Sequence, residues 1–358
     1  MYGLWLNNIP GMTYAKLGMI YRACSGAQEL YGMDEKRLMQ IPGLSVEDVR
    51  RIADSKKSWN LEREWTRLKE RGIRFVSIEQ SSYPEKLKNI SNPPYALYYT
   101  GRLPDPGKKS VAVVGARGRS AYGSQIARKL AHALAAAGVD IVSGMARGID
   151  SDGHMGALDA GGSTYAVLGC GVDICYPKQN QYLYMHIPEK GGILSEYPVG
   201  TAPLPAFFPQ RNRIISGLSD CTVVIEARAK SGSLITADCA MEQGRDVYAL
   251  PGRVTDELSQ GTNSLIRQGA GVIVSVEEFL ADLKLFGQNH AVQMDFRKNL
   301  LEKDETLVYS LFDFVPLGLG SMVQKSPYGL TELLDILERL ERKGLIRETV
   351  PNYFEKII

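Results

Sequence analysis

The fold is decided by residues 110–144, SVAVVGARGRSAYGSQIARKLAHALAAAGVDIVSG. A short β-branched run (110–114) is followed by a glycine-rich turn, a segment with helical apolar periodicity (124–138) and a second apolar run (139–143). Two short apolar runs joined by a helix of this length are typical of a parallel βαβ unit. The first glycine-rich turn therefore follows the carboxyl end of a strand, which is where such sheets bind ligands.

The same alternation continues downstream. Further apolar runs read TYAVLG, CTVVIEA, DVYALPG and GVIVS, and helical segments such as LITADCAMEQG lie between them. Strands that alternate with helices predict an α/β fold: a Rossmann-like, mostly parallel sheet with helices on both faces, over residues 108–285.

The flanking segments have different patterns. Residues 1–75 predict a small helical domain, similar to a SAM or helix-hairpin-helix domain, and residues 76–107 a connector in which ALYYTG forms an edge strand. A polar linker is expected at 286–300, and 301–358 resembles a winged helix. Within the first segment, LMQIPGLSVEDVRRIADS reads as helix, turn and helix, with Ser45 as N-cap and Asp48 three residues later. Its turn either offers N–H groups to a phosphate or is purely structural, and Ser45 in place of a second glycine favours the structural turn.

Charge limits how the protein could hold a nucleic acid. Lys and Arg number 42 against 40 Asp and Glu, which gives a net charge of +2, and residues 108–285 carry 17 of each sign. Residues 301–358 carry seven basic and ten acidic side chains, a net −3 that argues against DNA reading by this segment. A nucleic-acid partner would therefore need a local cluster of arginines.

Composition also bears on location and on the cysteines. No window approaches the ~18 apolar residues of a membrane span, and the first residues lack the pattern of a signal peptide. We expect a cytoplasmic protein with no membrane partner. The five cysteines form no C-x-x-C motif and mostly lie in apolar runs, so we expect reduced core thiols and no metal site.

Three glycine-containing turns are suited to anions. The first, VVGARGRSAYG, is neither G-x-G-x-x-G nor a P-loop, so no nucleotide cofactor is expected; it offers Arg117, Arg119 and Ser120 instead. The second, SGMARGID, has small residues that allow close backbone approach: Ser143, Gly144 and Gly148. Its Asp150 and His154 are better explained as a structural pair than as acid–base groups. In the third, Ser231 and Gly232 open a helix.

The stretch PQRNRIIS (209–216) places two cations beside an apolar pair. We expect FPQRNR to be extended, because side chains two apart share a face only in an extended segment. Arg211 and Arg213 would then hold successive phosphates, while Asn212 contacts a base edge or a neighbouring loop. The alternative is that one arginine forms a structural ion pair with a buried acid such as Glu226.

Taken in order, the motifs VVGAR, SGMARGID, LGCGVDICYP, FPQRNRIISGLS, EARAKSGSLITA and DVYALPG closely resemble the DNA-processing protein A (DprA, also called Smf) family. The resemblance is dense over residues 75–285. It implies a non-enzymatic protein of natural transformation that binds and protects incoming single-stranded DNA, forms a homodimer and loads the recombinase RecA. It also implies a DNA site around Arg117, the SGMARGID turn with its glycines and Arg147, Lys178, Arg211 and Arg213.

Two other functions remain open. A nucleotide-cleaving phosphoribohydrolase would use acids near strand ends, here Glu196, Glu226 or Glu242, although its P-G-G-x-G-T motif is missing. A winged-helix regulator would need a basic C-terminal segment. For the homodimer, the apolar residues of segment 263–286 predict the contact surface: Leu265, Ile266, Val274, Phe279, Leu283 and Leu285.

Overall fold

The computed structural model describes residues 1–283, 301–312 and 316–356. They belong to two compact units, Met1–Leu285 and Phe286–Ile358. The linker expected at 286–300 lies outside the described residues.

The larger unit is built on a sheet with nine strands among its described residues, in the order β1-β2-β6-β5-β4-β3-β7-β8-β9. The pairs β1/β2 and β2/β6 are antiparallel, and the six other pairs are parallel. This confirms the Rossmann-like, mostly parallel sheet. The strands are β1 (Arg74–Ser77), β2 (Ala96–Gly101), β3 (Ser110–Val114), β4 (Asp140–Ser143), β5 (Thr164–Val167), β6 (Gly192–Ser195), β7 (Cys221–Val224), β8 (Asp246–Ala249) and β9 (Gly271–Val272).

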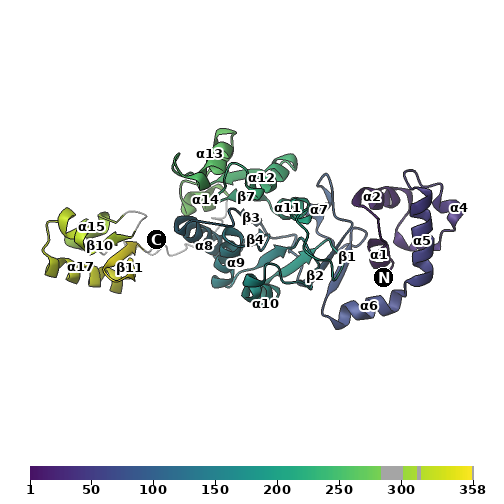
Figure 1. Cartoon of the computed structure of the whole chain (residues 1–358), viewed down its shortest axis with the longest axis horizontal. Coiled ribbons are helices and arrows are strands. Elements are labelled where there is room, and N and C mark those ends of the chain that lie inside the picture. The colour runs from purple at the N-terminus through teal and green to yellow at the C-terminus, as the bar shows by residue number, and fades with distance from the viewer. Residues whose placement is uncertain (284–300, 313–315, 357–358) are drawn as a thin grey trace. The chain divides into compact units, whose positions relative to one another are not determined.

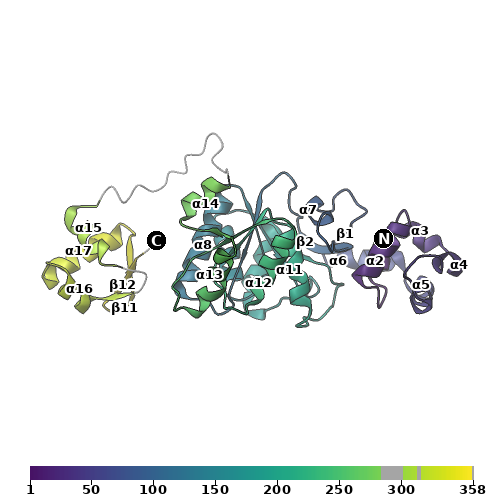
Figure 2. The same cartoon turned by 90° about the horizontal axis from the view of Figure 1, so that it is seen from above.

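Helices cover both faces of this sheet, as Figures 1 and 2 show. Alternate residues of the central strand β3 enter different cores: Ala112 and Val114 pack with α11 and α12, whereas Val111 and Val113 pack with α8 and α14. Every residue of β3 is therefore buried, which explains its continuous apolar run. The covering helices are α7 (Glu85–Lys88), α8 (Ala121–Ala136), α9 (Ile149–Asp159), α10 (Gln181–Lys190), α11 (Phe207–Gly217), α12 (Gly232–Glu242), α13 (Gln260–Arg267) and α14 (Val276–Asp282), with 3₁₀ turns η1 (Lys178–Asn180) and η2 (Glu257–Ser259).

The N-terminal helices share a core with the sheet. Trp5 and Leu30 belong to the same buried cluster as Phe75, Tyr98 and Ile193. β1 spans the boundary predicted at 75/76 and forms the sheet edge. The predicted edge strand, β2, instead pairs on both sides because β6 lies next to it. These helices are α1 (Tyr2–Asn7), α2 (Tyr14–Ala23), α3 (Ala27–Gly32), α4 (Glu35–Leu38), α5 (Val46–Ser58) and α6 (Leu61–Glu70).

The turn between α4 and α5 is held by the protein's own carboxylate. Ser45 and Asp48 form a capping box, in which Asp48 Oδ2 accepts from the Ser45 backbone N–H at 3.0 Å. Lys16 Nζ donates to the other Asp48 oxygen at 2.6 Å. Burial alone would raise the pKa of Asp48, but the bonds from Lys16 and Ser45 lower it to about 2. The anion position beside Ser45 is thus already filled, which supports the structural reading of this turn.

The C-terminal unit contains three helices and a three-stranded sheet among its described residues. Its core includes Val308, Leu333, Ile336 and Phe354. Its last two strands form an antiparallel hairpin. The elements are α15 (Lys303–Ser310), β10 (Leu317–Gly318), α16 (Leu319–Lys325), α17 (Leu330–Arg342), β11 (Ile346–Val350) and β12 (Tyr353–Lys356), with sheet order β10-β12-β11.

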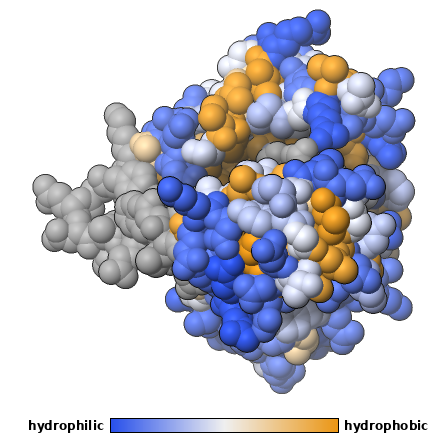
Figure 3. All heavy atoms as spheres, turned by 90° about the vertical axis from the view of Figure 1, so that its left-hand side faces the viewer, coloured by the Kyte–Doolittle hydropathy of each residue, from blue (hydrophilic) through white to orange (hydrophobic). Residues whose placement is uncertain are grey.

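Some of the apolar residues predicted to form the homodimer contact belong to the core instead. Leu265 and Phe279 are buried within the larger unit, so they cannot contact a second copy. Val274 is 71% exposed, and Leu285 lies outside the described residues. The face in Figure 3 is mostly hydrophilic, with hydrophobic side chains in smaller patches between the charged ones.

Candidate nucleic-acid interface

A cleft opens at the carboxyl ends of β3 and β7, where the chain order of the sheet reverses direction. From β3 the chain proceeds through β4, β5 and β6 to one side, and then returns to place β7 on the other side of β3. Open α/β sheets bind ligands at such switch points. The cleft has a volume of about 620 Å³. Most of its lining comes from the loops after β3, β4 and β7 and from α11 and α12, with single residues from α9, η2 and the loops after β5 and β6. The lining residues are Val114, Gly115, Ala116, Arg117, Gly118, Ala146, Asp150, Tyr176, Pro205, Phe208, Pro209, Arg211, Asn212, Ile215, Arg228, Lys230, Ser231, Gly232, Ser233, Ile235, Thr236 and Leu258.

The cleft is electropositive. Its charged lining residues are four cations and one carboxylate. Arg117 and Lys230 are exposed, and neither makes a hydrogen bond or an ion pair with the described residues; Arg228 has a loose pair with Glu257 at 3.5 Å. The domain as a whole has no net charge to attract a nucleic acid, but the cleft has this local excess of positive charge.

Two of the cations lie close to one aromatic ring. The guanidinium carbons of Arg117 and Arg211 each lie 5.9 Å from the centroid of the Phe208 ring. The Tyr176 ring, 41% exposed, lies 5.4 Å from the same ring. Cations close to an aromatic ring suit a ligand with alternating phosphates and bases.

Arg211 is fixed at the base of the cleft. Its Nη1 donates to the Gly144 carbonyl at 2.8 Å and to the Val167 carbonyl, and its Nε donates to Asn212 Oδ1 at 3.2 Å. Nη2 makes no hydrogen bond with the described residues and remains for a ligand. Burial lowers the pKa of Arg211 to about 10, so the group stays charged at neutral pH. Gly144 is required here, because a Cβ would lie 2.6 Å from Nη2.

The SGMARGID turn is rigidly held beneath Arg211. The buried Asp150 carboxylate accepts from the Gly144 and Ala146 backbone N–H groups at 3.1 and 3.4 Å. Burial raises the pKa of Asp150. The charge of Arg211 and the hydrogen bonds from these N–H groups act in the opposite direction and lower it, but burial has the larger effect. Met145 has φ +54°, a strained conformation for a non-glycine residue, and Asn180 Nδ2 donates to its carbonyl at 2.8 Å. Gly148 has φ +82° and packs against the Ala116 carbonyl, so this turn supports the Arg117 loop.

Asn212 joins two walls of the cleft. Its Nδ2 donates to the Gly232 carbonyl at 3.1 Å while its Oδ1 accepts from Arg211, so it contacts a neighbouring loop, one of the two expected roles. Ser231 caps α12 by accepting from the Ser233 N–H. A Cβ on Gly232 would meet no atom within 4 Å, so the start of α12 is open toward the cleft.

The expected extended conformation of FPQRNR is wrong. These residues form the first turns of α11, where two positions differ by about 200° around the axis. Arg211 therefore faces the cleft, and Arg213 faces away from it. Arg213 donates to both Glu196 oxygens at 2.8 and 2.6 Å and to the Asn92 carbonyl, and it is 15% exposed. It makes a structural ion pair, with Glu196 rather than Glu226.

Six further predicted site residues do not line the cleft. One is Gly144, which lies beneath Arg211 and accepts a hydrogen bond from it. Arg119 forms an ion pair with Asp152. Ser143 is fully buried and donates to the Val113 carbonyl. Gly148 is buried below the first loop. Arg147 and Lys178 are exposed on neighbouring segments and make no hydrogen bond or ion pair with the described residues.

Sequence reasoning missed Phe208, Tyr176, Arg228 and Lys230. Phe208 could have been found from its helical spacing to Arg211, three residues away. No such local signal indicates Tyr176. His154 and Asp150 do not bond each other: His154 is fully buried, with Nδ1 2.6 Å from Thr164 Oγ1, while Asp150 bonds the Gly144 and Ala146 N–H groups. Burial, and after it the charge of Arg211, lowers the pKa of His154 to about 3. No group of three or more His, Cys, Asp or Glu in the described part of the chain could hold a metal ion.

Residues 74–284 match the family described as DNA recombination-mediator protein A. The chain belongs to this family. Its relatives include protein Smf of Synechocystis, 40% identical over 250 residues, and DprA of Streptococcus pneumoniae, 45% identical over 208 residues. The alignments span 69% and 58% of this chain, and 63% and 73% of the relatives. The resemblance seen in the motifs is thereby confirmed.

Solved structures of the family share this fold. The crystal structure of DprA from S. pneumoniae superposes with a TM-score of 0.67 at 34% identity, covering 78% of this chain and 96% of that one. DprA from Helicobacter pylori, whose structure concerns its single-stranded DNA binding mode, superposes with a TM-score of 0.53 at 32% identity, covering 59% of this chain and 96% of that one.

The three glutamates of the hydrolase hypothesis do not converge. Glu196 is paired with Arg213, and Glu226 is buried where its oxygens accept from the Ser120 N–H and hydroxyl. Glu242 is exposed at the end of α12. None of the three lines the cleft of this family member.

Among the described helices, none is both long and apolar enough to cross a membrane.

Proposed function

We propose that the cleft binds single-stranded DNA and that the protein delivers the strand to a RecA-type recombinase in the cytoplasm. The observation that carries the proposal is the pairing of unbonded cations with an aromatic ring at the switch point of the sheet. Arg117, Lys230 and Nη2 of Arg211 contact phosphates, and Phe208 stacks with a base. The family description and the H. pylori relative support this assignment.

Arg117 tests the proposal, and Arg119 is its matched control. The two residues lie in one loop, but Arg119 is engaged by Asp152 and does not line the cleft. Arg117→Ala should flatten the slope of log affinity against log salt by about 0.7, the counterion term of one phosphate on a single strand. Arg119→Ala should leave the slope unchanged. Titrations with fluorescent oligonucleotides, single- and double-stranded, at several salt concentrations measure both; equal slopes for Arg117→Ala and the parent would refute the assignment.

A homodimer would join two such clefts into one longer track and raise avidity without new contacts. Val272 and Val274, at and just beyond edge strand β9, are 42% and 71% exposed and mark a surface for this contact. Val274→Asp should lower the mass of the full chain from dimer to monomer in light scattering. A parent protein that is monomeric at tens of micromolar would exclude the dimer.

The hydrolase alternative has its own assay. Incubation with nucleoside monophosphates would release free base if the chain cleaves nucleotides, and Glu242→Gln would abolish the release. We expect no base to be released.

A further inference from the structure

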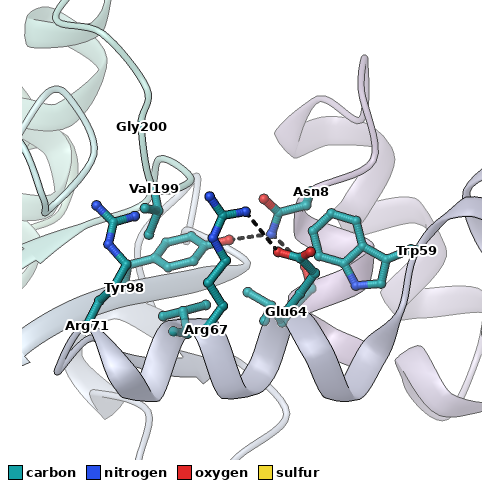
Figure 4. Close-up of a pocket in the computed structure, with 10 residues that line it drawn as sticks. Asn8, Trp59, Glu64, Arg67, Arg71, Tyr98, Val199 and Gly200 are labelled. Atoms are coloured by element: carbon teal, nitrogen blue, oxygen red, sulfur yellow. Dashed lines mark hydrogen bonds and ion pairs between the residues drawn. The ribbon is translucent and has the colours of Figure 1, made fainter.

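A second pocket lies in the larger unit where the N-terminal helices meet the sheet (Figure 4). It has a volume of about 200 Å³ and shares no lining residue with the cleft. Its walls come from α1, the end of α5, α6, β2 and the loop after β6: Leu4, Asn8, Trp59, Glu64, Arg67, Leu68, Arg71, Tyr98, Val199 and Gly200.

Two guanidinium groups line one side of this pocket. Arg67 and Arg71 are four residues apart and so share a helical face, and both project from the helix toward the same side in Figure 4. Asp173 orients Arg71: one oxygen accepts from Arg71 Nη2 at 2.8 Å, and the other from the Gly200 N–H at 2.9 Å. Arg67 lies 3.7 Å from Glu64 and makes no hydrogen bond with the described residues. Both groups keep N–H donors for a ligand.

Acceptors and aromatic surface line the rest of the pocket, with Glu64 on α6 beside Arg67. Asn8 Nδ2 donates to the Leu4 carbonyl at 2.8 Å and to the Tyr98 hydroxyl at 2.6 Å, which leaves Asn8 Oδ1 without a hydrogen bond among the described residues. The Glu64 carboxylate is only 18% exposed. Trp59 Nε1 is a buried donor with no partner in the described part of the chain, although buried indole N–H groups are ordinarily bonded.

The arginines alone have a simple structural explanation. Cations near the end of α6 complement the helix dipole, and Glu64 pairs with Arg63 at 3.1 Å. That explanation leaves the cavity and the free amide oxygen of Asn8 unaccounted for. A simple anion would be repelled by Glu64, and an apolar molecule would leave the guanidinium donors unpaired.

We propose that this pocket binds one nucleotide. The phosphate would lie against Arg67 and Arg71, and a base with N–H donors would reach Glu64 and Asn8 Oδ1, beside the rings of Trp59 and Tyr98. Guanine carries such donors in its amino group and ring N–H. The nucleotide comes either from solution or from a bound strand; only the second case rests on the function proposed above.

Calorimetric titration of the full chain with dGMP tests the pocket. Arg67→Ala should weaken dGMP binding roughly tenfold or more, the effect of losing a charge-assisted hydrogen bond. Within the described fold Arg67 would lose only its exposed ion pair with Glu64 at 3.7 Å, so a thermal melt should show that the variant is folded. Lys69→Ala is the matched control, because Lys69 lies on the same helix and contacts Trp65 outside the pocket. It should bind dGMP as the parent does, and Glu64→Gln should weaken dGMP more than inorganic phosphate.

The source of the nucleotide follows from a second measurement on the same variants. If Arg67→Ala also weakens a long single strand, the occupant belongs to that strand; if only dGMP binding falls, the pocket binds free nucleotide. The inference is overturned if dGMP does not bind at millimolar concentration, or if its binding depends on Arg117 and not on Arg67. Arg117→Ala with the oligonucleotide reports separately on the cleft, so failure of one site is distinguishable from failure of the other.

Discussion

The two ends of the sheet use cations in opposite ways. At the carboxyl ends of β3 and β7, Arg117 and Lys230 make no hydrogen bond or ion pair within the described residues. At the amino ends, Arg245 donates to the carbonyls of Ser219, Gly217 and Lys86, and Lys86 pairs with Asp220 at 2.8 Å. The same residue types thus stabilise one end and leave donors free at the other, so pairing, and not charge alone, distinguishes the cleft end of the sheet.

Arg245→Ala should have the largest effect and only on stability. The change leaves three carbonyls at the amino ends without their donor, which costs about 4 kcal/mol in the free energy of unfolding. Urea unfolding measures the loss. The slope of log DNA affinity against log salt should be unchanged. A flattened slope would show that the amino end of the sheet also contacts DNA.

Arg213→Ala should resemble Arg245→Ala although Arg213 lies two residues from a cleft arginine. Removing it leaves Glu196, 16% exposed, without its cation and should cost about 3 kcal/mol of stability. Oligonucleotide titration should give the parent's salt slope. A slope lower by about 0.7 would instead place Arg213 on a phosphate.

Substitution of Asp140, at the amino end of β4, should have a smaller effect on the free energy of unfolding, and should raise it where the two arginine substitutions lower it. Asp140 is 1% exposed, neither oxygen has a hydrogen-bond partner among the described residues, and burial raises its pKa to about 6. The folded protein therefore holds this proton when the unfolded chain has released it, so this group lowers stability as pH rises from about 4 to about 6.

Asp140→Asn should remove that loss and raise the free energy of unfolding by about 2 kcal/mol at pH 7. At pH 4 the variant and the parent should be equally stable. Urea unfolding at both pH values provides the comparison, and an equal gain at both would show that ionisation is not the cause.

Deletion of residues 301–358 should have the smallest effect. The segment is net acidic and contributes no residue to the cleft, so single-strand affinity should change by less than about 0.5 kcal/mol. A large loss of affinity in a folded truncated protein would assign DNA binding to this unit.

Local patterns were sufficient for much of the fold. The apolar runs predicted β3, β4, β5, β7, β8 and β9. In β3, β4, β5 and β7 every residue is buried, which explains their continuous apolar residues. Ser45 was identified as an N-cap from its position before a helical segment. The direction of Arg213 was not predictable in this way: Pro209 is compatible with a first helical turn as well as with an extended segment, and the turn it adopts decides which arginine faces the cleft.

The sequence by itself determined the α/β class, the order of the glycine turns and the family, since these depend on periodicity and short motifs within contiguous segments. Only the tertiary structure decided which cations are free. Arg119, Arg213 and Arg117 look alike in sequence, but Asp152 and Glu196 pair with the first two from 33 and 17 residues away, and nothing among the described residues pairs with the third. A charge is available to a ligand only when folding brings no opposite charge to it, and that depends on contacts between distant segments.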